Sequence, residues 1–175
     1  MNEVLKRKKR KQIYTQYINT RSICAEVGVF LGENASLILD KNPKHLYLID
    51  LWIQPHEKQN LTANDIYEKT YQQYIPLNNV TILRKDSVQV SSLFVNEFFD
   101  FVYLDTFHNY ELIHSELEAY LPKVKIGGYL AEDDYWQKTK NYGVIRAVDE
   151  IVKTKKVKSI LRCKKCGQFI LQRIS

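Results

Sequence analysis

The chain has 175 residues, which is enough for one domain with a full α/β core, and 45% of them are apolar. No apolar run approaches the ~20 residues that span a membrane, and the basic N-terminus lacks the apolar segment of a signal peptide. Composition therefore argues against a disordered chain and against membrane insertion, and it predicts a folded protein that is cytoplasmic, or nuclear if the basic N-terminus is an import signal.

The net charge of +6 is unevenly distributed along the chain. Residues 1–12 hold six Lys/Arg against one acid, and residues 153–175 hold eight against none. The body between them, residues 13–152, holds twelve basic residues against nineteen acids. The basic termini can bind nucleic acid or another anionic surface, or they can simply keep the protein in solution. The pattern leaves both interpretations open.

Apolar runs and helical spacings alternate along the chain. The predicted strands are residues 22–29, 45–49, 80–83, 99–104 and 129–131. The predicted helices are residues 12–19, 34–39, 65–74, 110–121 and 143–153. Residues 53–62 are expected to form a loop, and Gly127-Gly128 a turn. This alternation predicts βαβ units and a mostly parallel sheet.

The C-terminal region has a different pattern from the rest of the chain. Two β-rich runs, residues 157–162 and 168–174, predict an antiparallel hairpin. Cys163-Lys-Lys-Cys166-Gly167 lies between them and favours a turn over a zinc site, because no second Cys or His pair follows. We expect a basic, partly helical segment over residues 1–20 and a single domain over residues 21–175.

Acidic residues lie at or near the ends of four predicted strands. They are Glu26, Asp50, Asp105 and the pair Asp133/Asp134. In an open parallel sheet, ligands bind beyond the carboxyl ends of the strands. Converging carboxylates repel one another unless cations, hydroxyls or a metal lie between them. The sequence therefore predicts a polar ligand site at this edge.

Glycines after the first strand strengthen this prediction. Gly28 and Gly32 let the backbone approach a ligand closely, and the following helix offers its N-terminus. Asp50 lies 22 positions after Gly28, close to the spacing at which an acid receives ribose hydroxyls. Together these residues indicate a ligand that contains a nucleoside.

Several motifs resemble those of class I methyltransferases, which use S-adenosylmethionine (SAM). Residues 26–32, Glu-Val-Gly-Val-Phe-Leu-Gly, are similar to the first motif of that family, and Asp50-Leu-Trp52 to its second-strand motif. The segments 105–111, 127–128, 133–135 and 143–149 resemble the branch of macrocin-type sugar O-methyltransferases. The resemblance covers residues 22–152 and implies a Rossmann-like, seven-stranded, mostly parallel sheet. Its strand order would be 3-2-1-4-5-7-6, with strand 7 antiparallel and helices on both faces.

The resemblance also implies roles for individual residues. The implied SAM-binding residues are Glu26, Gly28, Gly32, Asp50, Leu51, Trp52, Asp86, Ser87 and Asp105. Asp50 would hold the ribose, and Asp86 with Ser87 would flank the adenine. His108 matches a proposed general base, with Asp105 beside it in the catalytic site. Asp105, Asp133 and Asp134 match positions that hold a divalent metal such as Mg²⁺ in metal-dependent members.

The sequence departs from this branch at one point, because Thr106-Phe107 stands where relatives carry Gly-Asp. We expect an O-methyltransferase for a small-molecule or sugar hydroxyl, with Mg²⁺ assistance and a homodimer both left open. One alternative is an RNA or DNA methyltransferase whose basic termini bind phosphate. The other is a SAM-binding module that has lost catalysis, which the acid missing at Phe107 would suit.

Overall fold

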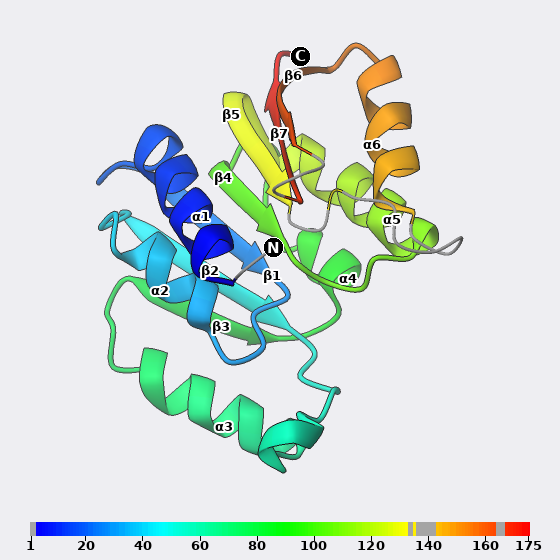
Figure 1. Ribbon diagram of the computed structural model, residues 1–175. Coiled ribbons are helices and arrows are strands. Elements are labelled where there is room, and N and C mark those ends of the chain that lie inside the picture. The colour runs from blue at the N-terminus through cyan, green and yellow to red at the C-terminus, as the bar shows by residue number, and fades with distance from the viewer. Residues whose placement is uncertain (1–2, 133–134, 136–142, 164–166) are drawn as a thin grey trace.

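The computed structural model describes residues 3–132, 135, 143–163 and 167–175. Its seven strands form one sheet in the order β3-β2-β1-β4-β5-β7-β6 (Figure 1), as the resemblance implied. All pairings are parallel except those that β7 makes with β5 and β6. The strands are β1 Ile23–Val27, β2 His45–Asp50, β3 Val80–Arg84, β4 Phe99–Leu104, β5 Val124–Glu132, β6 Val157–Cys163 and β7 Gln168–Arg173.

Helices cover both faces of this sheet (Figure 1), which confirms the predicted fold class. One face carries α1 Glu3–Tyr17, α2 Glu33–Leu39 and α3 Ala63–Tyr74. The other face carries α4 Ser87–Ser91, α5 Tyr110–Tyr120 and α6 Val144–Lys153. Short 3-10 turns occupy Glu57–Gln59 and Leu121–Lys123. In the part of the chain that the structure describes, no helix has the length and apolar character needed to cross a membrane.

The alternation of side chains along β1 shows how the two cores form. Successive side chains of a strand point to opposite faces, so Cys24 and Glu26 face the α1–α3 layer. Ala25 and Val27 face the α4–α6 layer, where they pack in the second buried cluster. Glu26 therefore points into one of the protein's two helix–sheet layers.

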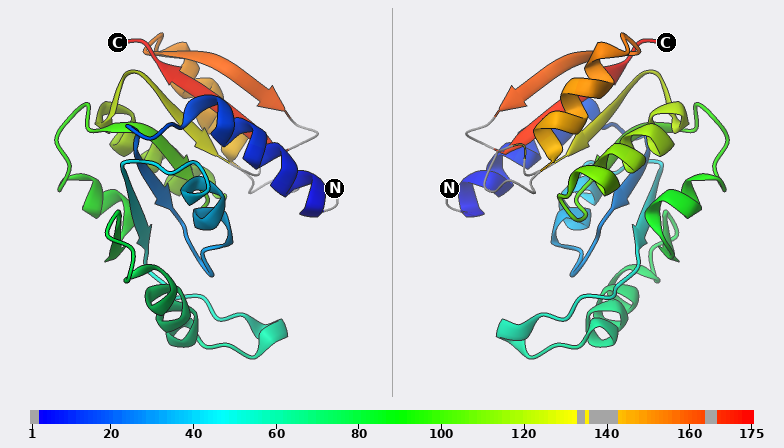
Figure 2. Two further views of the ribbon diagram at one scale, coloured as in Figure 1. Left: turned by 90° about the vertical axis from the view of Figure 1, so that its left-hand side faces the viewer. Right: turned by 90° about the vertical axis from the view of Figure 1, so that its right-hand side faces the viewer.

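The N-terminal helix is longer than predicted, because the basic run is part of α1. Tyr14 of α1 is fully buried and makes edge-to-face contacts with Phe101 and Tyr103 of β4. Its hydroxyl donates a 2.6 Å hydrogen bond to Oδ1 of Asn34 on α2. Figure 2 shows α1 running across one face of the sheet, with its N-terminal turns extending past the strands. The helix is therefore anchored by both apolar and polar contacts.

The predicted turn at Gly127-Gly128 is wrong, because both glycines lie inside the nine-residue strand β5. The pairing of β4 with β5 changes from Phe99–Val124 to Phe101–Tyr129, so β5 bulges between these two pairs. A Cβ on Gly128 would lie 2.9 Å from the carbonyl oxygen of Asp100. The two glycines do interrupt the regular backbone, but they mark a bulge within β5 and not a turn between two elements.

The segment 53–62 contains more structure than a simple loop. His56 and Leu61 form an isolated antiparallel bridge around the turn Glu57–Gln59, and the segment projects from the body of the protein (Figure 2). Thr62 then caps α3 through a reciprocal capping box with Asp65, so this helix starts two residues earlier than predicted.

Replacing Tyr14 with Phe tests the anchoring of α1. The variant leaves the Asn34 carbonyl oxygen without its buried donor, and we expect a loss of about 1–3 kcal/mol in the free energy of unfolding. Urea denaturation measures this loss. Tyr17→Phe on the same helix is the matched control, since the Tyr17 hydroxyl makes no hydrogen bond within the described residues. Equal stability of the two variants would contradict the assignment.

Candidate active site

A cleft of about 350 Å³ opens at the carboxyl ends of β1, β2 and β4. This is the edge at which parallel sheets bind ligands. The predicted site residues that line the cleft are Gly28, Asp50, Leu51, Trp52, Asp86, Ser87, Asp105 and His108. Most of the residues singled out from sequence thus lie together in space.

Asp50 fixes the loops that border the cleft. Its Oδ2 accepts hydrogen bonds from the backbone N–H groups of Val29 at 2.8 Å and Phe30 at 2.9 Å. Its Oδ1 accepts from the N–H of Trp52 at 2.6 Å. Phe30 and Trp52 both have positive φ, which is a costly conformation for residues other than glycine. The carboxylate therefore stabilises two strained positions, one in the loop after β1 and one in the loop after β2.

Gly28 directly follows β1 and lies between the ends of β2 and β4. Its N–H donates to the Ile49 carbonyl at 2.8 Å, and the Asp105 N–H donates to the Val27 carbonyl at 2.7 Å. A Cβ on Gly28 would overlap the carbonyl group of Asp105, and the residue has a φ of +88°. Only glycine fits this position without displacing the β4 loop that carries Asp105.

Gly32 supports the glycine loop from behind, and it does not line the cleft. The Tyr74 hydroxyl donates to the Gly32 carbonyl at 2.6 Å, and a Cβ on Gly32 would overlap the Tyr74 ring. The Phe30 carbonyl accepts hydrogen bonds from both Thr70 and the Trp52 indole. Helix α3 and Trp52 thus hold the loop in place.

Glu26 lies outside the cleft lining, buried against α1 and α2. Its Oε1 accepts a 3.0 Å hydrogen bond from the Asn34 side chain, which in turn accepts one from Tyr14. Burial raises the pKa of the Glu26 carboxyl well above its ordinary value. The hydrogen bond from Asn34 opposes that rise in pKa, and the nearby charge of Asp105 adds to it.

Apolar side chains form much of the cleft rim. Phe30, Leu51, Ile53 and Phe107 all line the cleft, and each exposes more than a third of its surface. Asp86, which also lines the cleft, caps α4 by accepting a 2.9 Å hydrogen bond from the Gln89 N–H. The cleft therefore combines a polar floor with an apolar mouth.

Glu116 is a cleft residue that the sequence reasoning missed. It is fully buried on α5 and accepts hydrogen bonds from the Ser87 hydroxyl at 2.5 Å and the Thr106 hydroxyl at 2.6 Å. Burial raises the pKa of its carboxyl to about 7 against the opposing effect of these hydrogen bonds. Its position among the apolar residues Ile113, Leu117 and Tyr120 was the available signal.

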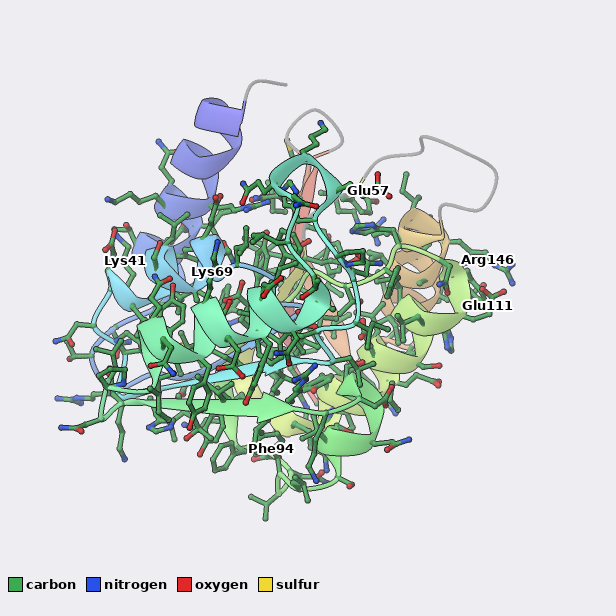
Figure 3. All side chains as sticks on the ribbon, turned by 90° about the horizontal axis from the view of Figure 1, so that it is seen from below. Lys41, Glu57, Lys69, Phe94, Glu111 and Arg146 are labelled. Atoms are coloured by element: carbon green, nitrogen blue, oxygen red, sulfur yellow. The ribbon has the colours of Figure 1, made fainter. Side chains whose placement is uncertain are left out.

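His108 is positioned by the start of α6. Its carbonyl accepts a 3.0 Å hydrogen bond from the Gly143 N–H, and a Cβ on Gly143 would overlap the backbone of Tyr110. Nearby, the Arg146 guanidinium stacks on the Tyr110 ring at 3.9 Å. Figure 3 shows Arg146 on α6 and Glu111 on α5 at the same edge of the molecule. Close packing of α5 and α6 therefore holds the His108 loop.

The described residues do not assemble the implied metal site. They contain no group of three or more His, Cys, Asp or Glu side chains that could hold a metal ion. Asp133 and Asp134, two of the three implied ligands, lie outside the described residues. The third, Asp105, has the Arg10 guanidinium of α1 4.0 Å from its carboxylate. A cation from the chain itself thus lies beside this acid.

The family of this chain follows from its match to a sequence model. The sequence model of the methyltransferase domain family matches residues 25–135, well over half of the chain. The protein belongs to this methyltransferase family. The match confirms the methyltransferase prediction, while the macrocin-type branch stays a prediction. No curated protein sequence matches this methyltransferase.

Solved structures show the same fold at low sequence identity. A Streptococcus mutans protein assigned as a methyltransferase, in complex with S-adenosylhomocysteine (SAH), has a TM-score of 0.65, 15% identity and 94% coverage of both chains. A Staphylococcus aureus protein assigned as a caffeoyl-CoA O-methyltransferase has a TM-score of 0.70 and 15% identity, covering 97% of this chain and 83% of its own. A Clostridium thermocellum protein assigned as an rRNA methylase has a TM-score of 0.68 and 14% identity, covering 95% and 94%.

Replacing Gly28 with Ala tests the close approach at the cleft floor. We expect a loss of stability about 1–3 kcal/mol larger than that of Gly127→Ala, as for an overpacked core. Gly127 has a similar φ of +84°, but nothing lies within 4 Å of its added Cβ, so it controls for backbone strain alone. Urea denaturation compares the two variants, and similar losses would mean that the contact with Asp105 costs nothing.

Proposed function

We propose that this methyltransferase uses SAM as its methyl donor and that the cleft at the ends of β1, β2 and β4 binds it. The observation that carries this proposal is the Asp50 carboxylate beside the glycine loop at the cleft floor. An ionised carboxylate has about four acceptor sites, and three backbone N–H groups occupy three of them. The remaining capacity can accept a ribose hydroxyl.

The remaining cleft residues fit the other parts of SAM. Asp86 and Ser87 form a polar wall for the adenine, and Leu51 offers an apolar surface to its ring. Gly28 lets the backbone approach the chain that joins the ribose to the sulfonium, next to Asp105. Glu26 and Gly32 would act indirectly, by holding the glycine loop from behind.

The proposed reaction is methylation of a hydroxyl on a small molecule or a sugar-containing acceptor. When bound, SAM supplies an electrophilic methyl group for in-line displacement. His108 lines the cleft and can accept the proton that the acceptor hydroxyl loses. Asp105 lines the same part of the cleft and favours a positive charge there. The apolar mouth at Ile53 and Phe107 fits an acceptor with an apolar ring or face.

Calorimetric titration of SAH with the wild type and Asp50→Asn tests the cofactor assignment. We expect the wild type to bind and the variant to bind at least about tenfold more weakly, since it loses the charged acceptor. Asp40→Asn is the matched control, because Asp40 is exposed at the end of α2. Melting temperatures recorded alongside separate loss of binding from loss of folding. Absence of SAH binding by the wild type would overturn the proposal.

The same titration with and without Mg²⁺ tests the metal prediction, and RNA-binding and turnover assays test the alternative functions. Tighter SAH binding with Mg²⁺ than with a chelator would support a metal site that includes Asp133 and Asp134. RNA binding that weakens steeply with salt would favour the nucleic-acid alternative. SAH binding with no turnover of any hydroxyl acceptor would favour the non-catalytic module.

Replacing His108 with Ala tests the proposed base. With an acceptor found by screening ring-containing alcohols, phenols and sugars, we expect the rate of methyl transfer to fall about 10²–10⁴-fold. The Kd for SAH should stay close to the wild-type value, because the base contacts the acceptor rather than the donor. His114→Ala, on the outer part of α5, is the control. A His108 variant with unchanged turnover would remove this residue from the mechanism.

A further inference from the structure

Glu116 connects the two walls of the cofactor cleft. Ser87 begins α4 directly after the β3 loop, and Thr106 follows β4. Both hydroxyls donate to the same carboxylate, at 2.5 Å and 2.6 Å. All three residues border the cleft, and Glu116 lies behind its surface, fully buried. The Tyr120 hydroxyl donates to the Ser87 carbonyl at 2.8 Å and fixes this wall from the other side.

The direction of these hydrogen bonds determines what the wall can offer to a ligand. An ionised carboxylate only accepts hydrogen bonds. The Ser87 and Thr106 hydroxyls must therefore each use their one proton to donate a hydrogen bond to Glu116. The oxygens of Ser87 and Thr106 then keep lone pairs and no proton for the cleft. A ligand group that donates an N–H can bind there, whereas a carbonyl oxygen would face other acceptors.

We propose that Glu116 is a positioning residue that makes this wall accept hydrogen bonds and thereby selects a purine with a 6-amino group over one with a 6-carbonyl group. The inference rests on the proposed function, because adenine is the base of SAM. Glu116 acts through the hydroxyls of Ser87 and Thr106 and need not touch the purine.

The protonation state of Glu116 gives the selection a pH dependence. Burial raises the pKa of this carboxyl to about 7, so it is mostly ionised at pH 8 and mostly protonated at pH 6. A protonated carboxyl donates to one hydroxyl, which can then turn its own proton toward the cleft. The preference for the amino purine therefore weakens as the pH falls through 7.

Other ionisable groups surround this site and must be separated from Glu116. The negative charge of Asp86 contributes to the raised pKa of Glu116, and the Tyr120 hydroxyl lies behind Ser87. The other ionisable side chains that line the cleft are Asp50, Lys85, Asp105 and His108. A pH effect that survives in Glu116→Gln belongs to one of these groups.

The test compares the binding of SAH with that of S-inosylhomocysteine, which has a 6-carbonyl in place of the 6-amino group and an N1–H in place of the adenine N1 lone pair. We expect the wild type to prefer SAH about tenfold or more at pH 8, and by less at pH 6. Glu116→Gln should prefer SAH at least about threefold less than the wild type does at pH 8, and its preference should not weaken further at pH 6, since its amide donates to one hydroxyl while Asp86 remains as an acceptor. Calorimetry measures the affinity of each protein for each ligand at both pH values.

Controls make each outcome informative. Glu118→Gln lies on the same helix with an exposed side chain, and it should keep the wild-type preference. Thr106→Val removes one of the two acceptors and should reduce the preference even if Glu116→Gln fails to fold. Equal affinity of the wild type for both ligands, or an unchanged preference in the folded Glu116 or Thr106 variants, would overturn the inference. Failure of the wild type to bind SAH would instead overturn the proposed function.

Discussion

The Asp50 carboxylate is the interaction on which the cleft depends. Three backbone N–H groups from two loops converge on it, and two of them belong to the left-handed residues Phe30 and Trp52. These conformations are unfavourable on their own, so their persistence requires a partner that outweighs the strain. The same carboxylate that we assign to the ribose is therefore also a structural element, because it shapes the loops that define the site.

Behind these loops lies a second set of polar contacts, which joins β1 to two helices of one layer. Glu26, Asn34 and Tyr14 form a buried chain of hydrogen bonds from β1 through α2 to α1. Gly28 then brings the β1 loop against the Asp105 backbone. Because both layers are closely packed, the strand ends can present acids to one cleft without collapsing onto each other.

Much of the fold was predictable because its signals are local. Buried parallel strands give continuous apolar runs, and β4 was bounded to the residue from such a run. Gly127-Gly128 was misread because a bulge and a turn share the same glycine signal, and only the pairing with β4 distinguishes them. The site residues that follow strands were found for the same reason, since parallel strand ends meet at one edge.

Glu116 could not be assigned from sequence because its role depends on two partners that are 29 and 10 residues away along the chain. A single acid on an apolar helix face indicates a buried partner, but it does not say which one. Glu26 shows the converse problem, since its motif predicts a cofactor contact while strand alternation directs it into a helix layer. A residue's place in a motif therefore does not determine which face of the sheet its side chain occupies.

The anchoring of α1 has a consequence for how the chain is made. Tyr14 packs on Phe101, which is synthesised 87 residues later, so the docking surface for α1 is missing when the helix leaves the ribosome. At about 5–20 residues per second, this delay lasts roughly 4–17 seconds. The dense positive charge of residues 6–11 keeps the undocked segment hydrated during that interval. The first helix therefore cannot make its contacts with β4 until more than half of the chain has been synthesised.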